Sequence, residues 1–271
     1  MPIKINYSKK ASSKSSANFV FFTDEKFNIS NLKKYISNTE FSYIKDLLKT
    51  SDLKKSIFVF EINSKKKIIL ISIKKELKNV DIENLGAEFY NYINYGKNSE
   101  YFINSGSIIG KHENFTDYFL HGLKLKSYEF NKYKTKKETR LISINVLGNK
   151  NKPSTQNQLK FKALEEGTFY ARDLVSEPGN ILHPDEYAKR LGSLRSDGLK
   201  INIYDKKKLK KMGMNALLGV GMGSTRGSYL ITLEWNGAKN NSKPLAFVGK
   251  GVCFDTGGIS LKPAKFMEDM T

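Results

Sequence analysis

The amino-acid sequence predicts an α/β protein of two domains. Short segments rich in β-branched and aromatic residues alternate with amphipathic stretches along the whole chain. The 271 residues are enough for two domains of ordinary size. A polar stretch with Gly and Pro, residues 148–156 (GNKNKPSTQ), separates two blocks of regular pattern. We therefore expect an N-terminal α/β domain over residues 1–150, a linker with a connecting helix over 151–176, and a second domain over 177–271.

The first block alternates strand and helix patterns. Residues 18–23 (NFVFFT) are typical of a strand because they combine aromatic and β-branched side chains. Leu85, Phe89 and Tyr92 recur at helical spacing. The order of the strands in the sheet does not follow from this pattern. We expect strands at residues 18–23, 56–62, 67–73 and 140–147, and helices at 81–93 and 114–125.

The second block opens with a long helix. Phe161, Leu164 and Phe169 give residues 158–175 an apolar face, and the helix should end before Pro178-Gly179. We expect next a helix at residues 184–194, a strand at 200–204, a helix at 206–212, and strands at 229–235 and 245–248. The last of these strands leads into a glycine-rich loop.

Composition limits the class of protein. The chain is 39% hydrophobic, which allows a packed core, and its formal net charge is +19, spread over both halves. Cys253 is the single cysteine, so the chain forms no internal disulfide. The first residues lack the apolar core of a signal peptide, and no run of about 18 apolar residues predicts a membrane span. We expect a soluble cytoplasmic protein with no membrane partner.

Residues 248–263 (VGKGVCFDTGGISLKP) carry the chemistry-bearing side chains. The loop follows an apolar segment and places Lys250, Asp255 and Lys262 among four glycines, which allow tight turns. Loops at strand ends are where open α/β sheets bind ligands. A phosphate-binding loop is excluded because Gly251, rather than Ser or Thr, follows Lys250. From the residues alone, the segment is either a site or a glycine-rich turn with surface lysines.

The same ordered string resembles the signature of the leucyl aminopeptidase family, the cytosol aminopeptidases with two metal ions. Residues 171–180 (ARDLVSEPGN), 212–224 (MGMNALLGVGMGS) and 233–235 (LEW) are also similar to that family. The likeness is good from about residue 115 onward and loose over the first hundred residues. It implies that residues 177–271 are the first part of a mixed-sheet α/β metallopeptidase catalytic domain. It also implies an aminopeptidase that hydrolyses N-terminal residues from peptides.

The resemblance assigns roles to four residues. Lys250 and Asp255 match metal ligands, Asp255 bridging two divalent ions, Mn²⁺ or Zn²⁺, that activate a water. Lys262 matches a catalytic lysine that polarises the scissile carbonyl. Met270 matches a substrate-binding residue in the pocket for the first side chain. The family further implies a bicarbonate ion in the full-length protein and a homo-oligomer, a hexamer.

The family pattern continues beyond Thr271 with further Asp and Glu ligands. We therefore expect a truncated catalytic domain with too few ligands for two ions, and no activity for this chain alone. Two alternatives remain open. One is a basic module without catalysis that binds nucleic acid weakly, or binds another partner, through its charge of +19. The other is a short paralogue that acts as a regulatory subunit in an oligomer of the family type.

Overall fold

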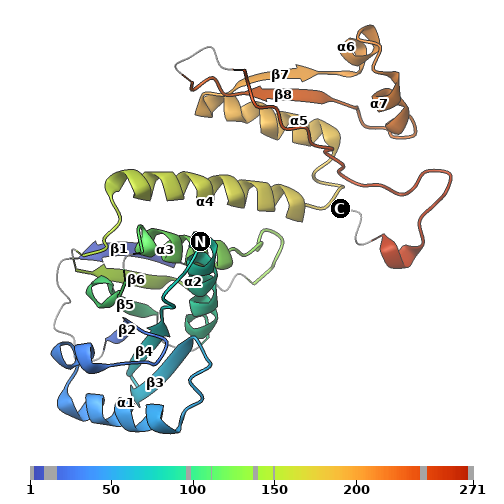
Figure 1. Cartoon of the computed structure of the whole chain (residues 1–271). Coiled ribbons are helices and arrows are strands. Elements are labelled where there is room, and N and C mark those ends of the chain that lie inside the picture. Colours follow the sequence, from blue (N-terminus) through green and yellow to red (C-terminus); the bar gives the residue numbers. More distant parts are fainter. Residues whose placement is uncertain are drawn as a thin grey trace. The chain divides into compact units, whose positions relative to one another are not determined.

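The chain folds into two compact units, residues 1–170 (unit 1) and 171–271 (unit 2). In the computed structural model (Figure 1), the described residues are 3–8, 17–95, 99–110, 112–136, 140–148, 150–238 and 243–267. No helix among these residues is long and apolar enough to cross a membrane. The mixed α/β class expected from the sequence is confirmed, whereas the domain boundaries expected near residues 150 and 176 stay a prediction.

Unit 1 is built on a six-stranded sheet in the order β1-β6-β5-β2-β4-β3. The first five strands of this order are parallel to their neighbours, and β3 is antiparallel to β4. All four strands expected in the first block are present within a residue or two of their expected bounds, and β1 and β5 join them. The strands are β1 (Ile3–Ser8), β2 (Asn18–Thr23), β3 (Ile57–Asn63), β4 (Lys66–Ser72), β5 (Glu100–Asn104) and β6 (Ile142–Leu147).

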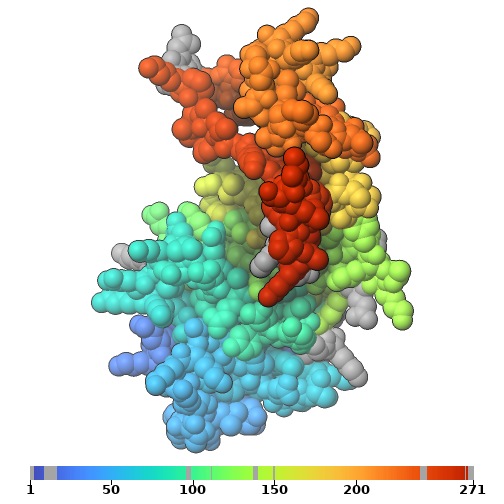
Figure 2. Space-filling model, turned by 90° about the vertical axis from the view of Figure 1, so that its right-hand side faces the viewer, coloured from blue at the N-terminus to red at the C-terminus, as the bar shows by residue number. Residues whose placement is uncertain are grey.

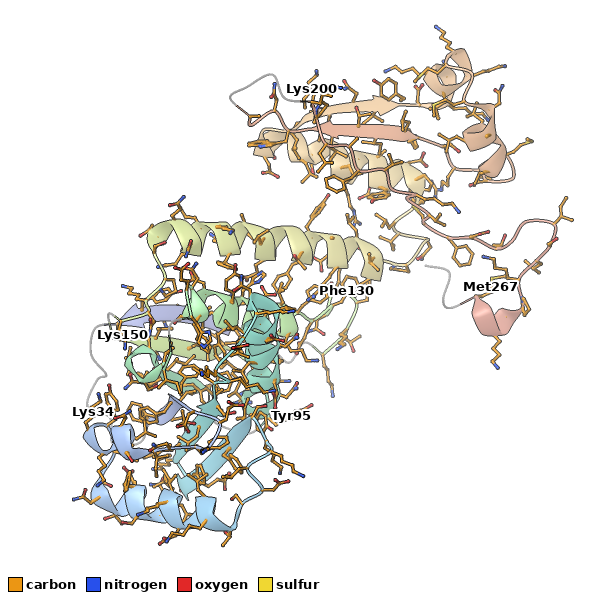
Figure 3. The ribbon with its side chains drawn as sticks, in the orientation of Figure 1. Lys34, Tyr95, Phe130, Lys150, Lys200 and Met267 are labelled. Carbon is orange, nitrogen blue, oxygen red and sulfur yellow. The ribbon has the colours of Figure 1, made fainter. Side chains whose placement is uncertain are left out.

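Helices cover both faces of this sheet, which explains its continuous apolar strands. The helices of unit 1 are α1 (Asn38–Thr50), α2 (Asn79–Ile93) and α3 (Phe115–Lys126), with short 3₁₀ turns η1 (Ser30–Lys34) and η2 (Ser105–Ser107). Along β4, Ile69 and Ile71 join the core under α2 and α3, whereas Ile68 and Leu70 join the core under α1. Side chains fill both layers (Figure 3). The period-2 alternation of a strand therefore supplies two cores from one apolar run.

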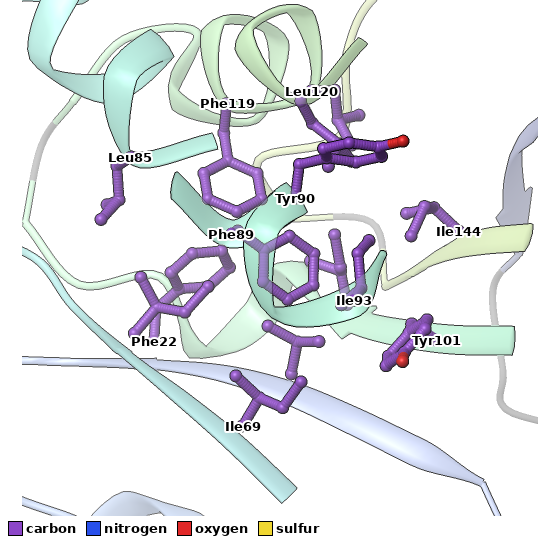
Figure 4. Close-up of a cluster of buried hydrophobic side chains, with 14 of the residues drawn as sticks. Phe22, Ile69, Leu85, Phe89, Tyr90, Ile93, Tyr101, Phe119, Leu120 and Ile144 are labelled. Carbon is purple, nitrogen blue, oxygen red and sulfur yellow. The ribbon is translucent and has the colours of Figure 1, made fainter. Parts of the chain in front are cut away.

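The larger core is aromatic. Phe119 of α3 packs edge-on against Phe22 of β2, with ring centroids 5.4 Å apart, and lies 5.6 Å from Phe89 of α2 (Figure 4). α2 and α3 cross closely, because Gly86 lies against the backbone of Phe119 and Gly122 against the backbone of Glu83. These two glycines therefore allow the close approach of α2 and α3.

A long helix, α4 (Thr155–Ser176), confirms the helix expected at residues 158–175. It begins in unit 1 and ends in unit 2. Within unit 1, its Phe161 packs edge-on against Tyr118 of α3, with centroids 5.1 Å apart. Its Glu165, also in unit 1, accepts a hydrogen bond of 3.2 Å from Lys124 of α3. These contacts hold the first half of α4 against α3.

Unit 2 contains a two-stranded antiparallel sheet with short helices. Its elements are α5 (Pro184–Ser193), η3 (Leu194–Asp197), β7 (Lys200–Tyr204), α6 (Lys206–Lys211), α7 (Asn215–Val220), β8 (Leu230–Glu234) and η4 (Ala264–Phe266). The strand expected at residues 245–248 was wrong, because that segment has no regular structure. No strand among the described residues pairs with it, and Val248 is 99% exposed. A β-strand forms by hydrogen bonding to a neighbouring strand, and this apolar run has none to pair with among the described residues.

Candidate functional site

The loop of residues 249–263 folds back on itself through two glycines. Gly257 and Gly258 adopt left-handed backbone angles, with φ of 88° and 65°. A side chain at position 257 would overlap the carbonyl oxygen of Ser260, so this turn requires glycine. The backbone N–H of Lys262 donates to the carbonyl oxygen of Thr256 at 2.9 Å and closes the turn. The turn brings Lys262 back beside Asp255.

Asp255 and Lys262 form an ion pair in this turn. The Lys262 ammonium donates to Asp255 Oδ2 at 3.1 Å, and the N–H of Gly257 donates to Asp255 Oδ1 at 2.8 Å. The N–H of Gly257 and then the Lys262 ammonium hold the pKa of Asp255 below its ordinary value, and the charge of Lys250 adds to the effect. Both oxygens of Asp255 are therefore engaged, and the carboxylate is ionised at neutral pH. The charges of Lys262 and Lys250, the two lysines predicted from the sequence, therefore both act on Asp255.

Glycines also let the loop lie against the rest of unit 2. A Cβ on Gly251 would come 3.0 Å from the ring of Tyr187 on α5, and one on Gly179 would come 3.0 Å from the carbonyl oxygen of Cys253. Cys253 is half-buried here, and burial raises the pKa of its thiol. A thiol in this state is a packing group and a poor nucleophile.

The start of α5 anchors the neighbouring backbone, a feature that the sequence reasoning missed. Asp185 accepts hydrogen bonds from the Tyr229 hydroxyl at 2.8 Å and from the Gly227 N–H at 3.2 Å. Arg190 donates to Glu177 Oε1 at 2.9 Å, and the Glu177 side chain is 1% exposed. The helix-start pattern His183-Pro-Asp-Glu signals α5, with the His183 ring as its N-cap. Tyr229 lies 44 positions from Asp185, so no local sequence pattern indicates that these two side chains meet.

The described residues do not form a complete metal centre. No group of three or more His, Cys, Asp or Glu side chains in the described ranges could hold a metal ion. The loop offers one carboxylate, Asp255, and one amine, Lys250, whereas stable sites in proteins use four or more donors for Zn²⁺ and six or more for larger ions. The residues present therefore do not fit two ions by themselves. Met270, the predicted substrate-binding residue, lies outside the described residues.

Comparison with known proteins identifies the part of the chain that contains this loop. A family model described as the cytosol aminopeptidase family, catalytic domain, matches residues 169–271. A probable cytosol aminopeptidase from a Bradyrhizobium species is 46% identical over 153 residues, which cover 55% of this chain and 31% of the relative. Residues 169–271 are therefore similar to the catalytic domain of the cytosol aminopeptidase family. The match spans about a third of the length of that relative, so the loop lies in a segment that the family shares.

Two solved structures share the fold of this chain. A mutant of tomato leucine aminopeptidase matches with a TM-score of 0.73 at 23% identity, over 94% of this chain and 55% of that one. The bottromycin maturation enzyme BotP in complex with Mn matches with a TM-score of 0.68 at 18% identity, over 93% of this chain and 51% of that one. At these identities the likeness concerns the fold. It extends to unit 1, where the sequence resemblance is loose.

Proposed function

We propose that the protein is an aminopeptidase that hydrolyses N-terminal residues from peptides in the cytoplasm with the help of divalent metal ions, Mn²⁺ or Zn²⁺. The observation that carries this proposal is the turn that joins Asp255 and Lys262 beside Lys250 within the family segment of residues 169–271. The Mn complex of the structurally similar BotP supports a divalent metal cofactor.

Asp255 is suited to bind a cation. A metal ligand must be deprotonated, and the lowered pKa of Asp255 means that it needs to release no proton at neutral pH. The Lys262 ammonium now lies 3.1 Å from its Oδ2, so a divalent ion would compete with an internal cation for the same oxygen. Lys250 would be the second donor and must lose its proton to bind. Metal binding should therefore strengthen as pH rises.

Lys262 would serve catalysis once its ammonium leaves Asp255. A fixed cation beside the scissile carbonyl stabilises the negative charge that develops on the carbonyl oxygen. The turn through Gly257 keeps the backbone of Lys262 close to Asp255, so the ammonium would stay near a substrate held at the metal site. When bound, the ions would supply an activated water and a Lewis acid. We also propose that Met270 contributes to the pocket for the first side chain of the substrate.

Two loop donors are too few for two ions, so other residues must complete the centre. We propose that the complete centre also holds the bicarbonate ion that the family resemblance implies, and that the active protein is a homo-oligomer, a hexamer. By the same reasoning, the 271-residue chain alone should have no aminopeptidase activity.

The test compares the native protein with this chain. Intact mass is measured on the protein isolated from its source, and leucine release from L-leucinamide is measured with Mn²⁺ and with EDTA for the native protein and the 271-residue chain. We expect a native mass above 30.8 kDa, activity that EDTA removes, and none from the chain alone. Asp255→Asn in the complete protein should abolish activity, and Asp46→Asn, at an exposed residue of α1, should not. Full activity of the Asp255→Asn variant would rule out the role of this carboxylate.

A further inference from the structure

Two contacts within unit 2 hold the loop of residues 249–263 in place. The ring of Tyr187 on α5 lies against Gly251, because a Cβ on this glycine would come 3.0 Å from Cε1 of the ring. Gly179 lies against Cys253 and Phe254, because a Cβ on it would come 3.0 Å from the carbonyl oxygen of the first and 3.0 Å from Cβ of the second. An added methyl group at either glycine would therefore push the loop aside by a few tenths of an ångström.

The two contact points lie directly beside the residues proposed to act in the reaction. Gly251 follows Lys250 in the chain, and Phe254 precedes Asp255. Residues 251–254, which connect the two charged residues, belong to no helix or strand. Most of the loop is exposed, and its atoms are in view at the molecular surface (red in Figure 2). Contacts with the rest of unit 2, rather than a ladder of hydrogen bonds, therefore fix its place.

A buried ion pair holds the turn that carries Gly179. The Glu177 side chain is 1% exposed, and its Oε1 accepts a hydrogen bond of 2.9 Å from Arg190 of α5. Two backbone N–H groups donate to the carbonyl oxygen of Pro178, each at 2.9 Å, and close the turn. A buried ion pair is often no more stabilising than apolar residues of the same volume, whereas its two partners fix the geometry of the elements that they join.

Both contacts depend on α5. Tyr187 and Arg190 are three residues apart, which places them at neighbouring positions on one face of this helix. The start of the helix is also fixed, because Asp185 accepts a hydrogen bond of 2.8 Å from the Tyr229 hydroxyl. The helix therefore supports the loop directly through the Tyr187 ring and indirectly through the turn that is paired with Arg190.

We propose that Tyr187 and Gly179 are positioning residues for the proposed aminopeptidase reaction. They set the place of the Asp255–Lys262 pair relative to Lys250. This pair is joined by its own hydrogen bond of 3.1 Å, so the loop contacts move it as a unit. Groups that act on one substrate must be held precisely, and a misplacement of about 1 Å can lower a rate about a hundredfold. The inference rests on the proposed function.

Amide chemical shifts of the 271-residue chain test the placement without any activity. Gly179→Ala adds a methyl group against the loop and should shift the amide resonances of Lys250 and Asp255. Gly219→Ala in α7 is the matched control, because no atom would lie within 4 Å of a Cβ there, and it should leave both resonances unchanged. Unchanged resonances of these two loop residues in Gly179→Ala would overturn the proposal.

Turnover of L-leucinamide by the complete protein tests the effect on the reaction. Gly179→Ala should lower kcat about tenfold and change KM much less, because the reacting groups are displaced by a few tenths of an ångström. Gly219→Ala should keep the wild-type kcat. A role in stability alone would lower the urea midpoint of unfolding and leave the kcat of the folded variant unchanged, which would contradict the proposal.

Two variants of Tyr187 decide the question should Gly179→Ala not fold. Tyr187→Phe keeps the ring that contacts Gly251 and should keep kcat, whereas Tyr187→Ala removes the ring and should lower kcat about tenfold. Equal kcat values in these two variants would overturn the proposal. A wild-type protein that hydrolyses no L-leucinamide would refute the proposed function and with it the role in the reaction, whereas the amide shifts would still show whether the loop is held by these contacts.

Discussion

Replacing Gly122 with alanine should destabilise unit 1, although the same change usually stabilises a helix. A Cβ at this position of α3 would overlap the carbonyl oxygen of Glu83 on α2. The contacting atoms are backbone, so no side chain can rotate away, and the two helices must part by about 1 Å to accept the methyl group. Parting would loosen the packing between Phe89 and Phe119, whose centroids lie 5.6 Å apart.

The magnitude follows from two opposing effects. Inserting a methyl group into a well-packed contact costs about 1–3 kcal/mol, and the backbone overlap here places the cost near the upper value. The higher helix propensity of alanine returns about 1 kcal/mol. The free energy of unfolding should thus fall by about 2 kcal/mol, and with a urea m-value of about 2 kcal/mol/M the midpoint should fall by about 1 M.

Gly167→Ala is the matched control for this prediction. Gly167 lies in α4, and no atom would come within 4 Å of a Cβ placed there. Helix propensity acts alone at this site, so the variant should be more stable by up to about 1 kcal/mol. Urea unfolding followed by circular dichroism measures both variants. A Gly122→Ala variant as stable as the wild type would show that α2 and α3 do not cross as closely as this contact requires.

Two further predictions concern unit 2. Lys262→Gln should raise the pKa of Asp255 toward its ordinary value, because the variant loses the ammonium and keeps only the Gly257 N–H as a donor that lowers this pKa. NMR titration of the carboxylate measures the shift, and an unchanged titration in the variant would contradict the prediction. Arg190→Ala should destabilise α5 by about 3 kcal/mol, because the buried Glu177 carboxylate loses a hydrogen bond of 2.9 Å from a charged partner. Hydrogen exchange of the α5 amides measures this loss of stability. An exchange pattern in that variant equal to the wild type would show that the ion pair contributes nothing.

Local pattern predicted most of the regular structure. The strands at residues 18–23 and 200–204 have the predicted bounds, and α5 begins at Pro184 as its helix-start residues indicate. Other elements were missed although a signal existed. α1 begins with a capping box of Ser37 and Glu40, a pattern that is readable in sequence. β1 carries polar residues between its apolar ones, and alone it is too short to stand out.

The sequence by itself predicted the alternation of strands and helices and the loop that carries Lys250, Asp255 and Lys262. These features depend on residues close together in the chain, where periodicity and glycine content act directly. Only the tertiary structure decided the strand order, in which β1 pairs with β6 and Asn6 donates to Asn145 across 139 positions at 3.1 Å.

The tertiary structure also decided which side chains meet. It placed Gly179 and the Tyr187 ring against the loop of residues 249–263, and it left residues 245–248 without a neighbouring strand among the described residues. Partners of this kind come from distant segments, and their choice depends on how whole layers pack, which no local pattern records. The chemistry of each side chain therefore follows from the sequence, whereas the residues that it contacts, and hence what it can do, are decided by the fold.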